Sequence, residues 1–194
     1  MKKLLLLLVT LSLSICSFAQ IIEKDEIDEF LGTRKMQTTW VRWFASFSNE
    51  VSLRFRSVDD KIYLEIATFD NLFIDKGNSL YLLLDNKDVI ELNSMGYYTP
   101  QKGGGTTRGR LASAGYGIHA LYEGNMEKLK YHIPKKIRVY TSSEYAEYKV
   151  KDGQKIRDSF NLINNKIIQY YPNKTTEKSE AEKAELDSLL NIQY

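Results

Sequence analysis

The chain has 194 residues, 27 of them basic and 25 acidic. Two of the basic residues, Lys2 and Lys3, stand at its start, so the rest of the chain carries 25 charges of each sign. A neutral chain lacks the dense positive field of a nucleic-acid binder, which excludes that class of partner and argues against strong attraction to anionic lipid.

The first 19 residues have the order of a secretory signal peptide. A basic start precedes the apolar run 4–15, and Ser17-Phe18-Ala19 supplies small residues before Gln20. We expect cleavage between Ala19 and Gln20 and export to the periplasm or the cell exterior. The alternatives are an uncleaved anchor, which needs about 20 apolar residues, and a lipid on Cys16, for which Ile15 is too large a neighbour. No later stretch is apolar for long enough to cross a membrane.

Cys16 is the only cysteine, and it lies in the predicted leader. The exported part therefore has no disulfide, thiol nucleophile or thiolate ligand, and its fold depends on an apolar core. Its length suits one domain, which we place at residues 20–171, followed by a charged helical tail at 172–194.

The N-terminal half of this domain reads mainly as strands. Residues 21–32 are acidic and are predicted to be mildly helical, and residues 33–47 form a first strand, bulged or broken. Residues 51–57 and 61–69 alternate between apolar and polar, and the turn at Asp59-Asp60 joins them into a hairpin. This alternation places Arg54 and Arg56 on the outer face, where we expect them to face solvent.

Further strands and two helices follow. Strands are predicted at 79–84, 89–92, 111–122, 137–141 and 145–150, with an irregular loop at 93–110 and a short helix at 125–132 that Pro134 ends. After Asp152, expected to cap a helix, one apolar stripe contains Ile156, Phe160, Ile163 and Ile167. The predicted fold class is α+β: a mostly antiparallel sheet, a curled sandwich or half-barrel, packed by this C-terminal amphipathic helix.

Catalytic motifs are missing from the sequence. The run Lys102-Gly103-Gly104-Gly105 places its lysine before the glycines, unlike a phosphate-binding loop. The two histidines, His119 and His132, lack the spacing of a zinc site, and no Gly-x-Ser-x-Gly elbow occurs. We therefore predict no metal and no cofactor. Acidic pairs such as Asp59-Asp60 read as solvated turns, because glycosidase carboxylates face each other across a cleft.

The glycine-rich loop and its neighbours are the best candidate for a ligand site. Long loops often carry binding functions, and aromatic side chains beside them can stack on sugars or peptides. The candidate ligand-binding residues are Tyr97, Tyr98, Arg108, Tyr116 and His119. Trp40 and Trp43 could also stack on ligands, but aromatic residues at strand spacing are more often core.

Two segments resemble a pattern in small exported proteins of Bacteroidetes-type bacteria. Asp28-Glu29-Phe30-Leu31-Gly32, followed by Thr39-Trp40, is similar to their "DEFTG…TSW" opening, although Leu31 replaces the threonine. Lys136-Ile137-Arg138-Val139-Tyr140-Thr141-Ser142, followed by Tyr145, is similar to their "KIRVYTS-GY" ending. The resemblance implies export and a β-rich domain with C-terminal helices, and it implies no activity.

These observations favour a non-enzymatic exported protein that binds a protein, peptide or glycan partner. One alternative is a hydrolase-like enzyme with a site near residues 93–119. Another is an envelope-associated structural subunit that docks through its tail.

Overall fold

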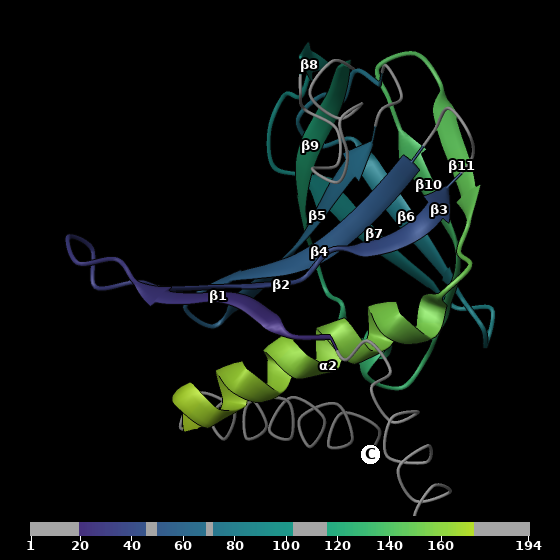
Figure 1. Cartoon of the computed structure of the whole chain (residues 1–194). Coiled ribbons are helices and arrows are strands. Elements are labelled where there is room, and N and C mark those ends of the chain that lie inside the picture. Colours follow the sequence, from purple (N-terminus) through teal and green to yellow (C-terminus); the bar gives the residue numbers. More distant parts are fainter. Residues whose placement is uncertain (1–19, 46–49, 69–71, 103–115, 173–194) are drawn as a thin grey trace, which may run out of the picture.

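In this computed structural model, residues 20–45, 50–68, 72–102 and 116–172 are described, and they form a curled antiparallel sheet with one long helix packed on it (Figure 1). The predicted fold class is therefore confirmed. The leader 1–19 and the tail 173–194 lie outside the described residues, so signal cleavage, lipidation of Cys16 and docking of the tail stay predictions. Within the described ranges, no helix has both the length and the apolar character that a membrane crossing requires.

The sheet has eleven strands in the described part of the chain, and its order is β1-β2-β4-β5-β9-β7-β6-β10-β11, with β3 beside β4 and β8 beside β9. The strands are β1 (Ile22–Ile27), β2 (Arg34–Thr38), β3 (Val41–Ala45), β4 (Glu50–Val58), β5 (Lys61–Thr68), β6 (Ser79–Leu84), β7 (Val89–Ser94), β8 (Gln101–Lys102), β9 (Tyr116–Glu123), β10 (Pro134–Tyr140) and β11 (Tyr145–Lys149).

The predicted hairpins are present. β4 and β5 pair along their whole length, and Asp59 in the turn between them has a positive φ of 53°. β6 pairs with β7, and β10 pairs with β11. Tight turns dictate these local pairings, whereas the contacts of β5 and β7 with β9, and of β6 with β10, join segments far apart in the chain.

The first predicted strand is broken, as one reading of its sequence allowed. β2 pairs with the C-terminal part of β4 and β3 with its N-terminal part, so the chain shifts at residues 39–40. The break removes a backbone acceptor opposite β4. The Thr38 hydroxyl replaces it by accepting the Phe55 N–H at 3.0 Å, so a buried donor keeps a partner.

The predicted helix at 21–32 is wrong, because this segment contains β1 and the turn that follows it. Lys24 and Glu26 form an ion pair at 2.6 Å, which two-residue spacing allows on one face of a strand but not on a helix. The charges that suggested a helix suit an edge strand, where they discourage pairing with other chains.

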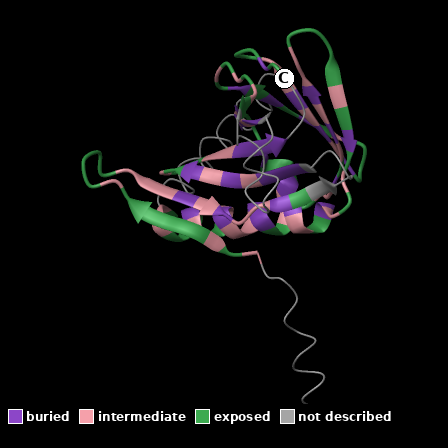
Figure 2. Ribbon diagram, turned by 45° about the horizontal axis from the view of Figure 1, so that its top comes forward, coloured by how far each residue is buried: buried purple, intermediate pink, exposed green. Residues whose placement is uncertain are grey.

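Helix α2 (Gly153–Tyr170) covers the inner side of the curled sheet near β2, β4 and β10. Its predicted stripe of Ile156, Phe160, Ile163 and Ile167 is buried. Figure 2 shows the colour of buried residues on parts of the helix that lie against the sheet. The Phe160 and Phe55 rings meet edge-on, with centroids 5.4 Å apart. Asp152 occupies the N-cap position, but its side chain makes no capping hydrogen bond and instead pairs with Lys155 at 2.5 Å.

The segment between β7 and α2 departs in detail from the sequence expectations. The short helix at 125–132 is a single 3₁₀ turn, η1 (Glu127–Lys130), with Leu129 buried. The irregular loop at 93–110 includes the two-residue strand β8, and residues 103–115 lie outside the described residues.

Candidate functional site

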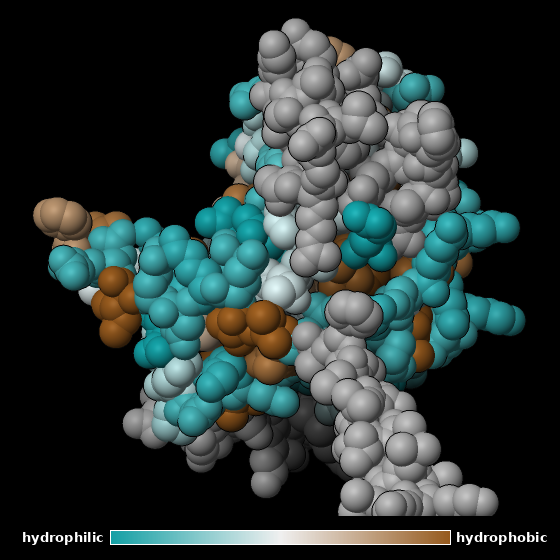
Figure 3. Space-filling model, viewed as in Figure 1, coloured by the Kyte–Doolittle hydropathy of each residue, from teal (hydrophilic) through white to brown (hydrophobic). Residues whose placement is uncertain are grey.

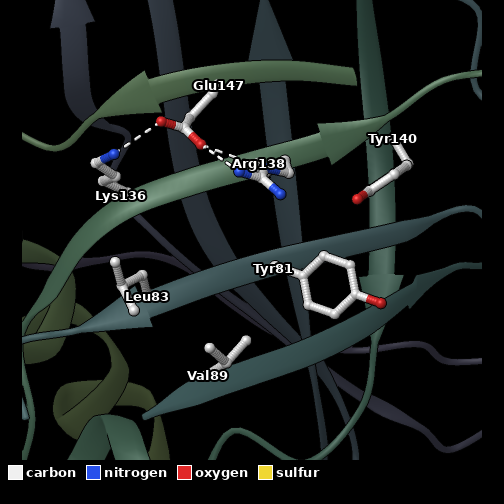
Figure 4. A pocket seen from close by; sticks show the side chains of 7 residues that line it. All are labelled: Tyr81, Leu83, Val89, Lys136, Arg138, Tyr140 and Glu147. Atoms are coloured by element: carbon white, nitrogen blue, oxygen red, sulfur yellow. Dashed lines mark hydrogen bonds and ion pairs between the residues drawn. The ribbon is translucent and has the colours of Figure 1, made fainter. Parts of the chain in front are cut away.

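A groove of about 420 Å³ crosses the outer face of β7, β6, β10 and β11 (Figure 4). We call it the tyrosine groove. Its lining side chains are Tyr81, Leu83, Val89, Lys136, Arg138, Tyr140 and Glu147. Its volume lies in the range of small-molecule and peptide sites, and every lining residue belongs to a strand rather than a loop.

Strand alternation explains why these side chains share one face. In β10, Ile137 and Val139 are fully buried, so Lys136, Arg138 and Tyr140 point the other way. The register places Arg138 opposite Tyr81 of β6 on one side and opposite Glu147 of β11 on the other. Three strands therefore deliver one row of side chains across the groove.

Glu147 organises the cations of the groove. Its carboxylate accepts from Lys136 Nζ at 2.9 Å and from Arg138 at 2.8 Å. The Lys136 ammonium, and then the Arg138 guanidinium, hold the pKa of Glu147 below its usual range. The hydrogen bond between Arg138 and Glu147, and then one between Arg138 and Tyr140, raise the pKa of Arg138. About 40% of the Arg138 side chain remains exposed, so a ligand can still reach its guanidinium.

Tyrosine rings lie beside these charged groups. The Tyr81 and Tyr140 rings meet edge-on, with centroids 5.6 Å apart, and Tyr140 lies 5.7 Å from Tyr145. The guanidinium of Arg138 lies 4.5 Å from the centre of the Tyr145 ring. The Tyr81 hydroxyl donates to Glu91 at 2.9 Å. Rigid, partly polar rings of this kind provide contact area at low entropic cost.

The residues that the sequence nominated lie elsewhere, beside the start of β9. Tyr97, Tyr98 and His119 line one smaller hollow of about 180 Å³, together with Thr99, Gln101, Gly117 and Ile118. Arg108 lies outside the described residues. Tyr116 begins β9, where its backbone pairs with Lys102, and its side chain is not described. The structure thus brings together three of the five nominated side chains.

A buried ionic cluster adjoins this hollow. Glu65, only 5% exposed, accepts from Arg54 Nε at 2.7 Å and lies 3.2 Å from His119 Nδ1. The Trp40 ring packs edge-on against His119, and the Arg54 guanidinium lies 4.3 Å from the centre of that ring. The expectation that Arg54 faces solvent is wrong, since 14% of its side chain is exposed. Glu65 on β5 is buried although it lies on the face expected to be outward, and its carboxylate holds Arg54 of the neighbouring strand β4 in an ion pair.

The described residues offer no ready metal centre. No group of three histidine, aspartate, glutamate or cysteine side chains gathers within them as a metal site. Glu65 could orient His119 as a general base, and Thr99 supplies a hydroxyl at the rim of the same hollow. The tyrosine groove instead provides cations, ring faces and apolar surface, which suit binding rather than bond cleavage.

Sequence reasoning missed the tyrosine groove. The sequence did contain a signal for it. Lys136, Arg138 and Tyr140 alternate with apolar residues along a predicted strand, so their side chains share its outer face. The partner strand β6 lies more than 50 residues earlier in the chain, and no local rule pairs it with β10.

Comparisons of the chain with protein-family models, with curated proteins and with solved structures gave no match. The likeness to exported Bacteroidetes-type proteins stays an expectation, and any function has to be argued from the site itself.

Proposed function

We propose that this protein is an exported, non-enzymatic binding domain whose tyrosine groove holds a short segment of a partner protein. The observation that carries the proposal is the half-exposed Arg138 guanidinium, held in place by Glu147 beside the Tyr81 and Tyr140 rings. Export is expected from the leader sequence. The partner segment is expected to come from another protein molecule.

The chemistry of the lining indicates what such a segment contains. Leu83 and the 51%-exposed Val89 offer apolar contacts, and the tyrosine rings add flat surface. Lys136 and Arg138 place two cations at the Glu147 end of the groove, whereas Glu91 lies at the Tyr81 end, so an anionic group is favoured beside the exposed part of Arg138. A peptide with an acidic side chain next to an aromatic or aliphatic one satisfies both demands.

Panning a random peptide display library on the purified protein tests this proposal. We expect enrichment of peptides that combine an acidic residue with a neighbouring apolar one. Arg138→Glu should weaken binding of the selected peptides at least tenfold, because it replaces the exposed cation with a carboxylate next to Glu147. Lys61→Glu, an exposed change far along the sheet, is the matched control and should leave binding unaltered.

Glu147→Gln provides a second test with the opposite sign. Removing this carboxylate leaves both cations to the ligand, so acidic peptides should bind as well as or better than before. The groove would be refuted as the binding site if the affinity of the selected peptides were the same for wild type and both groove variants. A library that yields no consensus sequence would refute it as well.

A second candidate function is hydrolysis at the smaller hollow. It is supported by the 3.2 Å approach of Glu65 to His119 Nδ1, a carboxylate–histidine contact of the kind that orients a general base. Turnover of p-nitrophenyl acetate that disappears in His119→Gln but survives in Arg138→Glu would favour it. No turnover above the uncatalysed rate would remove it.

A further inference from the structure

The β1–β2 hairpin forms an arm that projects from the sheet (Figure 1). Only three residues of β2, Lys35 to Gln37, pair with β4, so the far end of the hairpin has no neighbouring strand in the described part of the chain. A two-stranded ribbon is marginally stable by itself, which raises the question of what holds the arm in place.

Aromatic and ionic contacts with the end of α2 hold the arm next to its turn, where Arg34 begins β2. Arg34 makes two hydrogen bonds to Asp25 across the hairpin, at 2.7 and 3.0 Å. Its guanidinium lies 3.4 Å from the centre of the Tyr170 ring, and the Tyr170 hydroxyl donates to Asp25 at 3.1 Å. The Arg34 N–H also donates to Asp59 in the β4–β5 turn. These side-chain contacts add to the short β2–β4 pairing that joins the arm to the body.

The tip of the arm is apolar, unlike most hairpin turns. Phe30 is 98% exposed, Leu31 72% and Ile27 59%. Turns normally carry glycine, asparagine, aspartate and similar residues. Figure 3 shows hydrophobic colour at the end of the arm, well away from the body.

Local hydrogen bonds order this tip. The Asp28 carboxylate accepts the N–H groups of Phe30 and Leu31, both at 3.1 Å, and pairs with Lys35 at 2.6 Å. Gly32 closes the turn at a φ of 67°, which glycine adopts without strain. An ordered turn that presents two large apolar side chains loses little conformational entropy when it binds.

The tip has the features that the tyrosine groove recognises. Phe30 and Leu31 supply the apolar side chains, and the adjacent exposed Glu29 supplies the carboxylate. In Figure 1 the arm extends to the side opposite β11, so its tip points away from the groove of its own chain. The complementary surfaces can meet only between two molecules.

We infer that the arm tip of one copy docks in the tyrosine groove of a second copy, with Phe30 and Leu31 against the Tyr81–Tyr140 strip and Glu29 against Arg138. This inference rests on the proposed function, since it names the segment that the groove binds. The two surfaces differ, so the contact is head-to-tail and joins copies into a ring or an open chain.

Sedimentation of the exported chain, which begins at Gln20, from low micromolar to several hundred micromolar tests the inference. We expect the weight-average mass to rise to at least twice that of the monomer, and less so in high salt. The double variant Phe30→Ser with Leu31→Ser should remain monomeric throughout. Tyr131→Ser, which removes a 75%-exposed ring from the end of η1, is the matched control and should associate normally.

A charge reversal identifies the two surfaces. Glu29→Lys and Arg138→Glu should each weaken association several-fold, and the two together should restore it. A wild-type chain that stays monomeric, or a combined variant without restoration, would overturn the inference. So would a tip that binds phosphatidylcholine vesicles while the protein remains monomeric.

The outcome also separates this inference from the proposed function. The tip variant keeps an intact groove, so it can be tested with the display-selected peptides. Peptide binding without self-association would leave the proposed function standing and reject the second copy as the partner. Self-association that is insensitive to Arg138→Glu would place the contact outside the groove and reject the inference, whereas peptide binding to the same variant decides the proposed function separately.

Discussion

Arg54 and Glu65 stand directly opposite each other on β4 and β5, and their side chains meet at 2.7 Å with only 14% and 5% of each exposed. Arg56, two residues along β4, also approaches the Glu65 carboxylate, at 3.6 Å, but is 40% exposed. One carboxylate thus has a buried and an exposed arginine partner, which permits a matched comparison.

Arg54→Met should lower the free energy of unfolding by roughly 2–3 kcal/mol, somewhat less than the about 3–5 kcal/mol of breaking a fully isolated buried pair, because His119 and Arg56 remain near Glu65. Arg56→Met should change it by less than about 0.5 kcal/mol, as at most exposed sites. Urea unfolding followed by fluorescence measures both. Equal losses in the two variants would show that burial of the pair is unimportant.

Glu65 should also make stability depend on pH. Burial by itself would raise the pKa of Glu65, but hydrogen bonds from His119 and Arg54 outweigh it and leave the pKa below its ordinary value. A carboxyl of this kind stabilises the fold fully above its unfolded pKa of about 4.3, and the stabilisation is lost as the pH falls through the folded pKa. The stability difference between wild type and Glu65→Gln should therefore shrink on acidification. A difference independent of pH would contradict this account.

Gly153 at the start of α2 should not tolerate alanine, although alanine is the better helix former. A Cβ built on Gly153 would collide with the Pro134 carbonyl oxygen and lie 2.6 Å from Ile133 Cγ2, so α2 would have to move off β10. We expect Gly153→Ala to lower the melting temperature, while Asn165→Ala on the exposed face of α2 leaves it equal or higher. Comparable melting of both variants would refute the close packing.

Tyr122→Phe should be neutral or stabilising by up to about 1 kcal/mol. The Tyr122 side chain is fully buried, and its hydroxyl has no hydrogen-bond partner among the described residues. Burial raises the pKa of this phenol, in keeping with its apolar surroundings. Removal of an unsatisfied polar atom relieves its desolvation cost without leaving a large cavity. Chemical denaturation measures the effect, and a loss above about 1 kcal/mol would mean that the hydroxyl has a partner.

Tyr170→Ala should loosen the arm without unfolding the domain. The variant removes the ring beneath Arg34 and the donor to Asp25, while the buried stripe of α2 stays intact. Amide exchange in β1 and β2 should accelerate about fivefold for each kcal/mol lost, and exchange in β6 and β10 should stay unchanged. Tyr131→Ala is the control ring. Uniform acceleration across all strands would instead indicate global destabilisation.

Local patterns in the sequence determined much of the secondary structure. Alternation at 51–57 and 61–69 places apolar side chains on one face, and a short turn then allows only antiparallel pairing. The spacing of Ile156, Phe160, Ile163 and Ile167 likewise requires a helix with one buried side. These features depend on neighbours within a few residues, so they can be read without knowing the rest of the fold.

Only the tertiary structure decided the character of residues 21–32, the partners of β9 and β10, the burial of Arg54 and the existence of the tyrosine groove. The charged composition of β1 is compatible with a helix or an edge strand, and the difference comes from β2 and Tyr170 beside it. The groove arises when β6 and β10 pair over a long sequence separation. Such pairings are set by how the whole core closes, because many segments offer similar apolar faces and only their joint packing selects one arrangement.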